Sequence, residues 1–107
     1  YGELLNGSAV ILPAVPPGCE HVYRNYVVRV RDRDAIRSRL AERGIHTDLL
    51  YVPPIHLQTV FGDRRYRRGD LPVTEQLAEE LLGLPMFAEL TDAQVDYVGE
   101  SLREAVA

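Results

Sequence analysis

Residues 25–44 read NYVVRVRDRDAIRSRLAERG, and this stretch indicates the fold more clearly than any other part of the chain. Its first part, residues 25–31, is rich in β-branched and aromatic side chains, which favour a strand. Apolar side chains alternate along it, so we expect one buried and one half-exposed face. Asp32 follows as a predicted N-cap, and residues 35–43 follow as a helix with apolar side chains one turn apart.

Other elements are expected on both sides of this strand and helix. Two consecutive prolines, Pro53 and Pro54, exclude a central strand there and predict a rigid loop. The remaining expected elements are the end of a helix over residues 1–5, a strand over 9–12, extended segments over 45–51 and 84–86, one helical turn over 57–61, a helix from Pro72 and a last helix opened by a capping box at Thr91. This order predicts an α+β fold with helices covering a small, mainly antiparallel sheet.

The helix from Pro72 is expected to be amphipathic. Its inner side is predicted from the spacing of Val73, Leu77 and Leu81. Its acidic side chains, Glu75, Glu79 and Glu80, are predicted to lie outside.

Length and composition are those of one globular domain. The chain has 107 residues, of which 46% are hydrophobic and 26% charged. No run approaches the ~18 apolar residues of a membrane helix, so no membrane partner is expected. Cys19 is the single cysteine, which excludes an internal disulfide and a cysteine zinc site. We therefore expect a reducing, cytoplasmic location.

The most restrictive feature of the composition is the absence of lysine. All twelve basic residues are arginines. This chain alone therefore cannot form a Schiff base, supply a P-loop lysine or use lysine as a general base.

Charge is unevenly distributed along the chain. Residues 24–68 contain eleven arginines and five acids, a net charge of +6, whereas residues 69–107 have a net charge of −8. The positive middle suits a phosphate group or a nucleic acid. Its densest cluster, over residues 64–68, is accompanied by one aromatic residue, Tyr66, and has no stacking platform. We therefore expect no nucleic-acid partner.

Three histidines are the candidates for chemistry: His21, His46 and His56. Their spacing excludes a helical zinc pair, and no metal site is expected. The sequence has no glycine-rich phosphate loop, nucleophile elbow or paired carboxylates. His56 directly follows the proline loop, which can hold its side chain at a fixed angle. The residues alone thus indicate an α+β domain with a loop suited to binding.

Four motifs in order resemble the C-terminal domain of DegT/StrS-type sugar aminotransferases. HVYRNYVVRV at 21–30 resembles the strand that opens that domain. AERGIHT at 41–47 is similar to the family's A-x-x-G-I-x-T, and YVPPIHLQ at 51–58 is similar to Y-P-x-P-L-H-L-Q. LPM at 84–86, with the Leu, Thr and Val that follow, resembles the L-S-L-P-M…L-T…V ending. Together the four cover nearly the whole chain.

The resemblance implies a fold and an activity. Such enzymes have the fold of aspartate aminotransferase, use pyridoxal phosphate (PLP) and form homodimers. They transfer an amino group from an amino acid, expected to be glutamate, to a nucleotide-linked keto-sugar in deoxysugar and antibiotic biosynthesis. Their Schiff-base lysine lies in the large N-terminal domain. Residues 1–107 are then expected to be one small C-terminal domain of a longer chain, with residues 1–5 ending an interdomain helix, no catalytic residue and no PLP-binding residue.

The resemblance also implies substrate-binding residues. Tyr51 and His56 match family positions on the substrate side of the active site, where they would bond to sugar hydroxyls or to the diphosphate. Arg24 stands where the family often has another residue type, and an arginine there favours an anion. Leu50 and Val52 also depart from the family pattern.

Two alternatives stay open at this point. Within the family, some members are sugar dehydratases or act as cyclitol aminotransferases. Outside it, the arginine-rich middle would suit a non-catalytic module that binds nucleotides or a protein.

Overall fold

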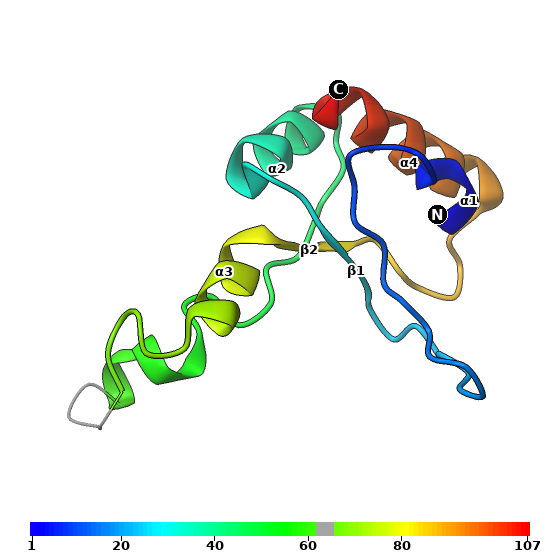
Figure 1. Cartoon of the computed structure of the whole chain (residues 1–107). Helices are drawn as coiled ribbons and strands as arrows, with labels where there is room; N and C mark the ends of the chain where they lie inside the picture. The colour runs from blue at the N-terminus through cyan, green and yellow to red at the C-terminus, as the bar shows by residue number, and fades with distance from the viewer. Residues whose placement is uncertain (62–65) are drawn as a thin grey trace.

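The computed structural model describes residues 1–61 and 66–107 (Figure 1). The elements in order are α1 (Gly2–Leu5), β1 (Tyr26–Arg29), α2 (Arg33–Glu42), the 3₁₀ turns η1 (Ile55–Leu57) and η2 (Thr59–Phe61), α3 (Pro72–Glu80), β2 (Leu81–Leu84) and α4 (Asp92–Val106). This is the α+β arrangement that the sequence predicts. No helix in these residues is long and apolar enough to cross a membrane.

The sheet consists of β1 and β2, which pair antiparallel with Tyr26 opposite Leu84 and Arg29 opposite Leu81. The segments over residues 9–12 and 45–51 lie beside it but form no strands. Ile11 pairs with Arg29 and Asp48 pairs with Gly83, each as a single bridge. The strand predicted over residues 9–12 is therefore wrong. Pro13 follows it directly and has no N–H to extend the ladder.

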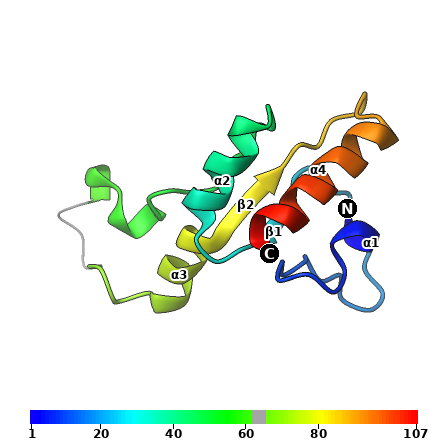
Figure 2. The same cartoon turned by 90° about the horizontal axis from the view of Figure 1, so that it is seen from above.

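Helices α2 and α4 cover one face of the sheet, and α1 packs beside α4 (Figures 1 and 2). Ile36 and Leu40 of α2 are buried, as their spacing predicts, and Tyr26 and Val28 of β1 are buried on the alternating pattern. The remaining buried apolar residues of the core are Leu5, Val10, Val30, Ile45, Leu82, Leu84, Val98, Leu102 and Ala105.

The two predicted helix starts turned out differently. At α4, Thr91 Oγ1 accepts the Gln94 N–H at 3.2 Å and Gln94 Oε1 accepts the Thr91 N–H at 3.0 Å, so the predicted capping box is confirmed. At α2, Asp32 occupies the N-cap position with φ +51° and makes no side-chain bond to the helix. An N-cap side chain needs extended backbone to reach the first turn, so this aspartate does not cap.

Helix α3 begins at Pro72 as predicted but passes into β2 without a loop. Leu81, expected on its inner side, belongs to the strand, and Val73 is 68% exposed because no described element covers it. Two of its acids do not lie outside. The Glu75 side chain is 11% exposed, and Glu80 pairs with Arg29 of β1.

Arg33 of α2 links α3 to the body of the fold, by which we mean the sheet with α1, α2 and α4. Its guanidinium is buried, although arginine is rarely buried without partners. Nη1 donates to the carbonyl of Ala78 at 2.6 Å and to that of Leu81 at 3.2 Å, and Nε donates to Asp34 at 2.8 Å. One side chain of α2 thus holds the last carbonyls of α3 and the start of β2.

A second contact fastens α3 to β1. Arg29 Nε and Nη2 donate to Glu80 Oε2 at 2.9 and 2.6 Å, and Gln76 Nε2 donates to Glu80 Oε1 at 2.8 Å. The Gln76 hydrogen bond, and then Arg29, lower the pKa of Glu80 below its ordinary value of 4.5.

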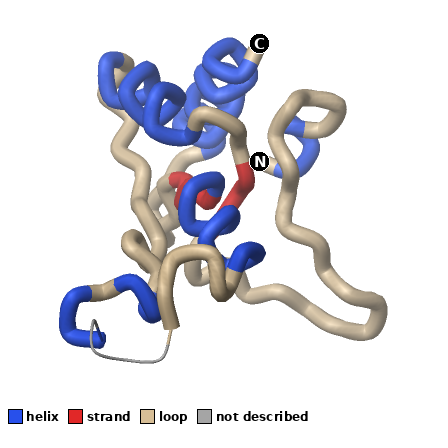
Figure 3. Tube along the Cα trace, turned by 60° about the vertical axis from the view of Figure 1, so that its left-hand side comes forward, coloured by secondary structure: helices blue, strands red, loops and turns tan. Residues whose placement is uncertain are grey.

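Two arms extend away from this body, one over residues 50–61 and 66–71 and one over the loop at 13–24 (Figures 1 and 3). The molecule measures 48 × 38 × 27 Å, and its radius of gyration is 15.4 Å. A compact domain of this length would have a radius of gyration of about 13 Å. The arms are therefore surfaces that the helical body does not cover.

The role of Arg33 leads to a stability prediction. Arg33→Met keeps the length of the side chain but removes the donors to the buried Ala78 carbonyl, so we expect the free energy of unfolding to fall by about 1–3 kcal/mol. Chemical denaturation of the 107-residue chain measures it. Arg37→Met, at an exposed position of the same helix, is the control and should stay within ~0.5 kcal/mol. Equal effects of the two variants would contradict the role of Arg33.

The Glu80 contacts lead to a prediction about pH. The folded chain favours ionised Glu80, so this contribution to stability is present above about pH 4.5 and is lost as the pH falls through the lowered pKa. Carboxyl ¹³C NMR should show a Glu80 midpoint below 4.5 that rises in Gln76→Ala and in Arg29→Gln. Arg37→Gln is the control and should leave the midpoint unchanged.

Candidate functional site

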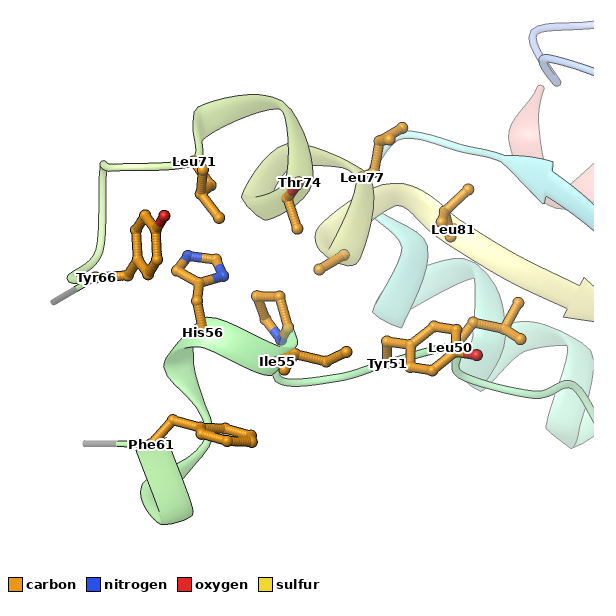
Figure 4. A pocket seen from close by; sticks show the side chains of 12 residues that line it. Leu50, Tyr51, Ile55, His56, Phe61, Tyr66, Leu71, Thr74, Leu77 and Leu81 are labelled. Atoms are coloured by element: carbon orange, nitrogen blue, oxygen red, sulfur yellow. The ribbon is translucent and has the colours of Figure 1, made fainter. Parts of the chain in front are cut away.

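A groove of about 990 Å³ runs between the loop that leads into η1 and the helix α3 (Figure 4). Its lining is mostly apolar, with few polar side chains, as is typical of sites for small molecules. The residues that line it are Leu50, Tyr51, Pro54, Ile55, His56, Phe61, Tyr66, Leu71, Thr74, Leu77, Ala78 and Leu81.

His56 lies on η1, two residues after Pro54, in the segment for which the sequence predicts a rigid loop. Its side chain is 6% exposed, and its ring projects toward Leu71 and Tyr66 (Figure 4). The Nε2 atom is buried and has no hydrogen-bond partner within residues 1–61 and 66–107. A buried polar atom without a partner is rare and marks a position that calls for an explanation.

Glu75 is an acidic side chain that the structure places close to this ring nitrogen. Its Oε2 lies 3.8 Å from His56 Nε2, too far for a hydrogen bond. Its two oxygens accept the Gly69 N–H at 2.8 and 2.9 Å. Gly69 has φ +96°, a conformation that side chains other than hydrogen disfavour. The carboxylate therefore ties the chain before α3 to the helix.

Tyr51 lies at the other end of the groove from His56 (Figure 4). Its side chain is 73% exposed, and its backbone is left-handed with φ +53°. The structure thus brings two of the three predicted substrate-binding residues, Tyr51 and His56, into one groove, with one on the rim and one in the wall.

Arg24, the third predicted residue, is not in the groove. It is exposed in the segment just before β1, in the arm opposite the one that carries η1 (Figures 1 and 3). Nearby, His21 Nδ1 accepts the Tyr23 N–H at 2.8 Å, and the two rings stack at 4.2 Å. Tyr23 in turn stacks on Tyr26 at 5.3 Å. His21 and Tyr23 therefore hold this segment in shape.

The remaining candidates stay apart from the groove. His46 is exposed, and Cys19 is exposed without a disulfide partner. Within residues 1–61 and 66–107, no group of three or more His, Cys, Asp or Glu is placed to hold a metal ion. Of the arginine cluster, positions 64 and 65 lie outside the described residues, and Arg67 and Arg68 are exposed.

Sequence reasoning missed the α3 side of the groove and the neighbouring Glu75, which lies beside His56. A helical wheel places this acid on the outer side, whereas its burial depends on the Gly69 N–H and on η1. A signal was present all the same. An acid shortly after a helix-opening proline, and six residues after a glycine, is well placed to bind a backbone N–H that precedes the helix.

Comparisons with known proteins add a family. The profile described as the DegT/DnrJ/EryC1/StrS aminotransferase family matches residues 1–103. The chain is 42% identical over 107 residues to a "pleiotropic regulatory protein" of Geobacillus stearothermophilus, covering 97% of this chain and 29% of that protein. It is 39% identical over 105 residues to a dTDP-3-amino-3,4,6-trideoxy-alpha-D-glucose transaminase of Micromonospora megalomicea subsp. nigra, covering 97% and 28%.

A comparison with solved structures also finds a similar protein. The S. venezuelae protein DesV superposes with a TM-score of 0.93 at 33% identity, over 97% of this chain and 28% of that one. The chain therefore spans less than a third of the length of these relatives, and its fold is that of the matching part of DesV.

Proposed function

This chain belongs to the DegT/DnrJ/EryC1/StrS aminotransferase family, and on that premise we propose that it forms the substrate-binding part of a PLP-dependent sugar aminotransferase. The complete enzyme would transfer an amino group from an amino acid, expected to be glutamate, to a keto-sugar carried on a nucleoside diphosphate. The observation that carries the proposal is the groove, in which two residues of the family's Y-P-x-P-L-H-L-Q motif, Tyr51 and His56, stand among apolar walls.

The residues of this chain do not fit an anchor for the cofactor itself. PLP supplies the electron sink for amino transfer when it is bound. Its covalent attachment needs a lysine, which the sequence lacks, and no arginine of residues 1–61 and 66–107 lines the groove. We therefore propose that the residues that hold PLP lie outside residues 1–107, and we assign no cofactor step to this chain.

The groove residues would bind and orient the sugar. Tyr51 on the rim presents a phenol hydroxyl that can donate to a sugar hydroxyl or to a diphosphate oxygen. His56 in the wall adds a second polar group of fixed direction. The apolar walls would cover the carbon faces of the sugar and exclude water from them. Fixed polar groups in a dry groove select a substrate by geometry as well as by affinity.

Arg24 has a different place in the proposal. It lies in the opposite arm, so within one chain it does not share a cavity with Tyr51 and His56. We propose that the full-length protein is a cytoplasmic homodimer and that Arg24 binds the substrate diphosphate from the second subunit. A guanidinium suits this task because it can bind two phosphate oxygens at once.

The test of the groove is the variant His56→Ala in the full-length protein, assayed with a panel of keto-sugar nucleotides. We expect kcat/KM for the preferred substrate to fall about 100-fold or more, because a polar group that orients the sugar is lost. The visible absorbance of bound PLP should remain. The control is His46→Ala, an exposed histidine outside the groove. Unchanged kinetics in His56→Ala would remove His56 from the site.

Arg24 has a test of its own. Arg24→Ala should raise the KM for the keto-sugar nucleotide about tenfold or more, the effect of losing one charged hydrogen bond. The half-reaction with the amino-acid donor, which carries no diphosphate, should stay unchanged. Arg37→Ala, exposed on α2, is the control. Equal loss in both half-reactions would place Arg24 elsewhere than at the diphosphate.

A further inference from the structure

Two largely buried polar side chains from different elements lie close together beside the groove: His56, which lines it, and Glu75 of α3. The His56 side chain is 6% exposed and the Glu75 side chain 11%. Glu75 already uses its carboxylate to accept the Gly69 N–H, whereas His56 Nε2 has no hydrogen-bond partner among the described residues. Their separation of 3.8 Å is within about 1 Å of a hydrogen bond.

The chemistry of the two groups is complementary. An ionised carboxylate only accepts hydrogen bonds and has about four lone-pair sites, so the Gly69 N–H leaves capacity for a second donor. A neutral imidazole carries its proton on one of its two nitrogens, and the hydrogen bond at one nitrogen decides the state of the other. A carboxylate beside Nε2 favours the proton there and leaves Nδ1 as the acceptor.

The orientation of the His56 ring decides which of its two nitrogens faces the groove. In Figure 4 one ring nitrogen of His56 points toward the side of Leu71 and Tyr66, and the other points toward the middle of the pocket. Nε2 is the nitrogen buried near Glu75, so Nδ1 is the one directed into the groove. Hydrogen bonds of this kind are often long without ligand and shorten when the site is filled.

We propose that Glu75 is a positioning residue for His56: its carboxylate accepts the Nε2–H proton and so presents Nδ1 to the substrate in the groove. The inference rests on the proposed function, because the substrate is the keto-sugar nucleotide assigned there. Nδ1 then accepts a hydrogen bond from a sugar hydroxyl. The same carboxylate, through the Gly69 N–H, fixes the chain before α3 and so holds the wall that the ring faces.

The first experiment reads the proton directly and needs no substrate. Full-length protein labelled with ¹⁵N-histidine, with the His56 signals assigned through His56→Ala, reports by NMR at pH 8 which nitrogen carries the proton. We expect Nε2–H in the wild type. In Glu75→Gln the amide offers one acceptor in place of two, so a mixture of tautomers is expected. Glu79→Gln, an exposed acid on the same helix, is the matched control and should match the wild type.

The second experiment is a double-mutant cycle in the amination assay. Glu75→Gln should lower kcat/KM up to about 100-fold in the wild type but less than about twofold in His56→Ala, because a residue that acts through His56 has nothing left to position. A structural role alone would give the same loss in both backgrounds.

The outcomes separate the two proposals. A wild-type His56 with its proton on Nδ1, or the same spectrum in wild type and Glu75→Gln, would overturn the role of Glu75 even if the enzyme is active. Equal losses in the two backgrounds of the cycle would overturn it as well. If no keto-sugar nucleotide is aminated, the proposed function fails while the NMR result still decides the Glu75 inference. If Glu75→Gln does not fold, the wild-type spectrum alone decides.

Discussion

The guanidinium of Arg33 is the contact on which the arrangement of the groove depends. It is buried between α2 and the junction of α3 with β2, and it supplies donors to carbonyls that the end of a helix leaves free. The core beneath is small, so one charged side chain takes over what a layer of apolar packing does in a larger domain. Without it, the helix that forms one wall of the groove would be joined to the body mainly through β2 and Glu80.

The groove shows how binding chemistry is built on weakly covered elements. Its two walls are a proline loop with 3₁₀ turns and a helix that no described element covers on its outer side. Other constraints replace apolar packing here. The hydrogen bond from the Gly69 N–H to Glu75 holds the segment before α3, and the two prolines restrict the backbone before η1. His56, which would contact a sugar, therefore lies next to the residues that hold the two walls in place.

The parts of the fold that the sequence predicts are those that follow a local rule. Tyr26 and Val28 alternate, and Ile36 and Leu40 repeat at helical spacing, so β1 and α2 could be read without the structure. β2 could not be placed in the same way. Leu82, Gly83 and Leu84 are all buried. A strand whose consecutive residues are all buried lacks the alternation of apolar and polar side chains by which a strand is recognised in a sequence.

The residues of the candidate site also differ in whether the sequence could predict them. His56 and Tyr51 stand in a contiguous motif and were predicted, although the family resemblance and not their spacing pointed to them. Glu75 belongs to none of the four motifs. The glycine six residues before it indicates only the contact with the Gly69 N–H, whereas its approach to His56, nineteen positions away, depends on the folded chain. Arg24 shows the reverse. It was predicted to bind substrate because an arginine at this position favours an anion, and it does not line the groove that contains Tyr51 and His56.

The loopless passage from α3 into β2 limits how this groove can evolve. One residue added or removed between Glu80 and Leu81 would rotate the helix by about 100° against the strand, carrying Thr74 out of the groove and Glu75 away from His56. An insertion or deletion of one residue within β2 itself would exchange the two faces of the strand and expose its core leucines. Length variation is therefore confined to the far end of the helix. New specificities must arise there or by replacement of single side chains along the walls.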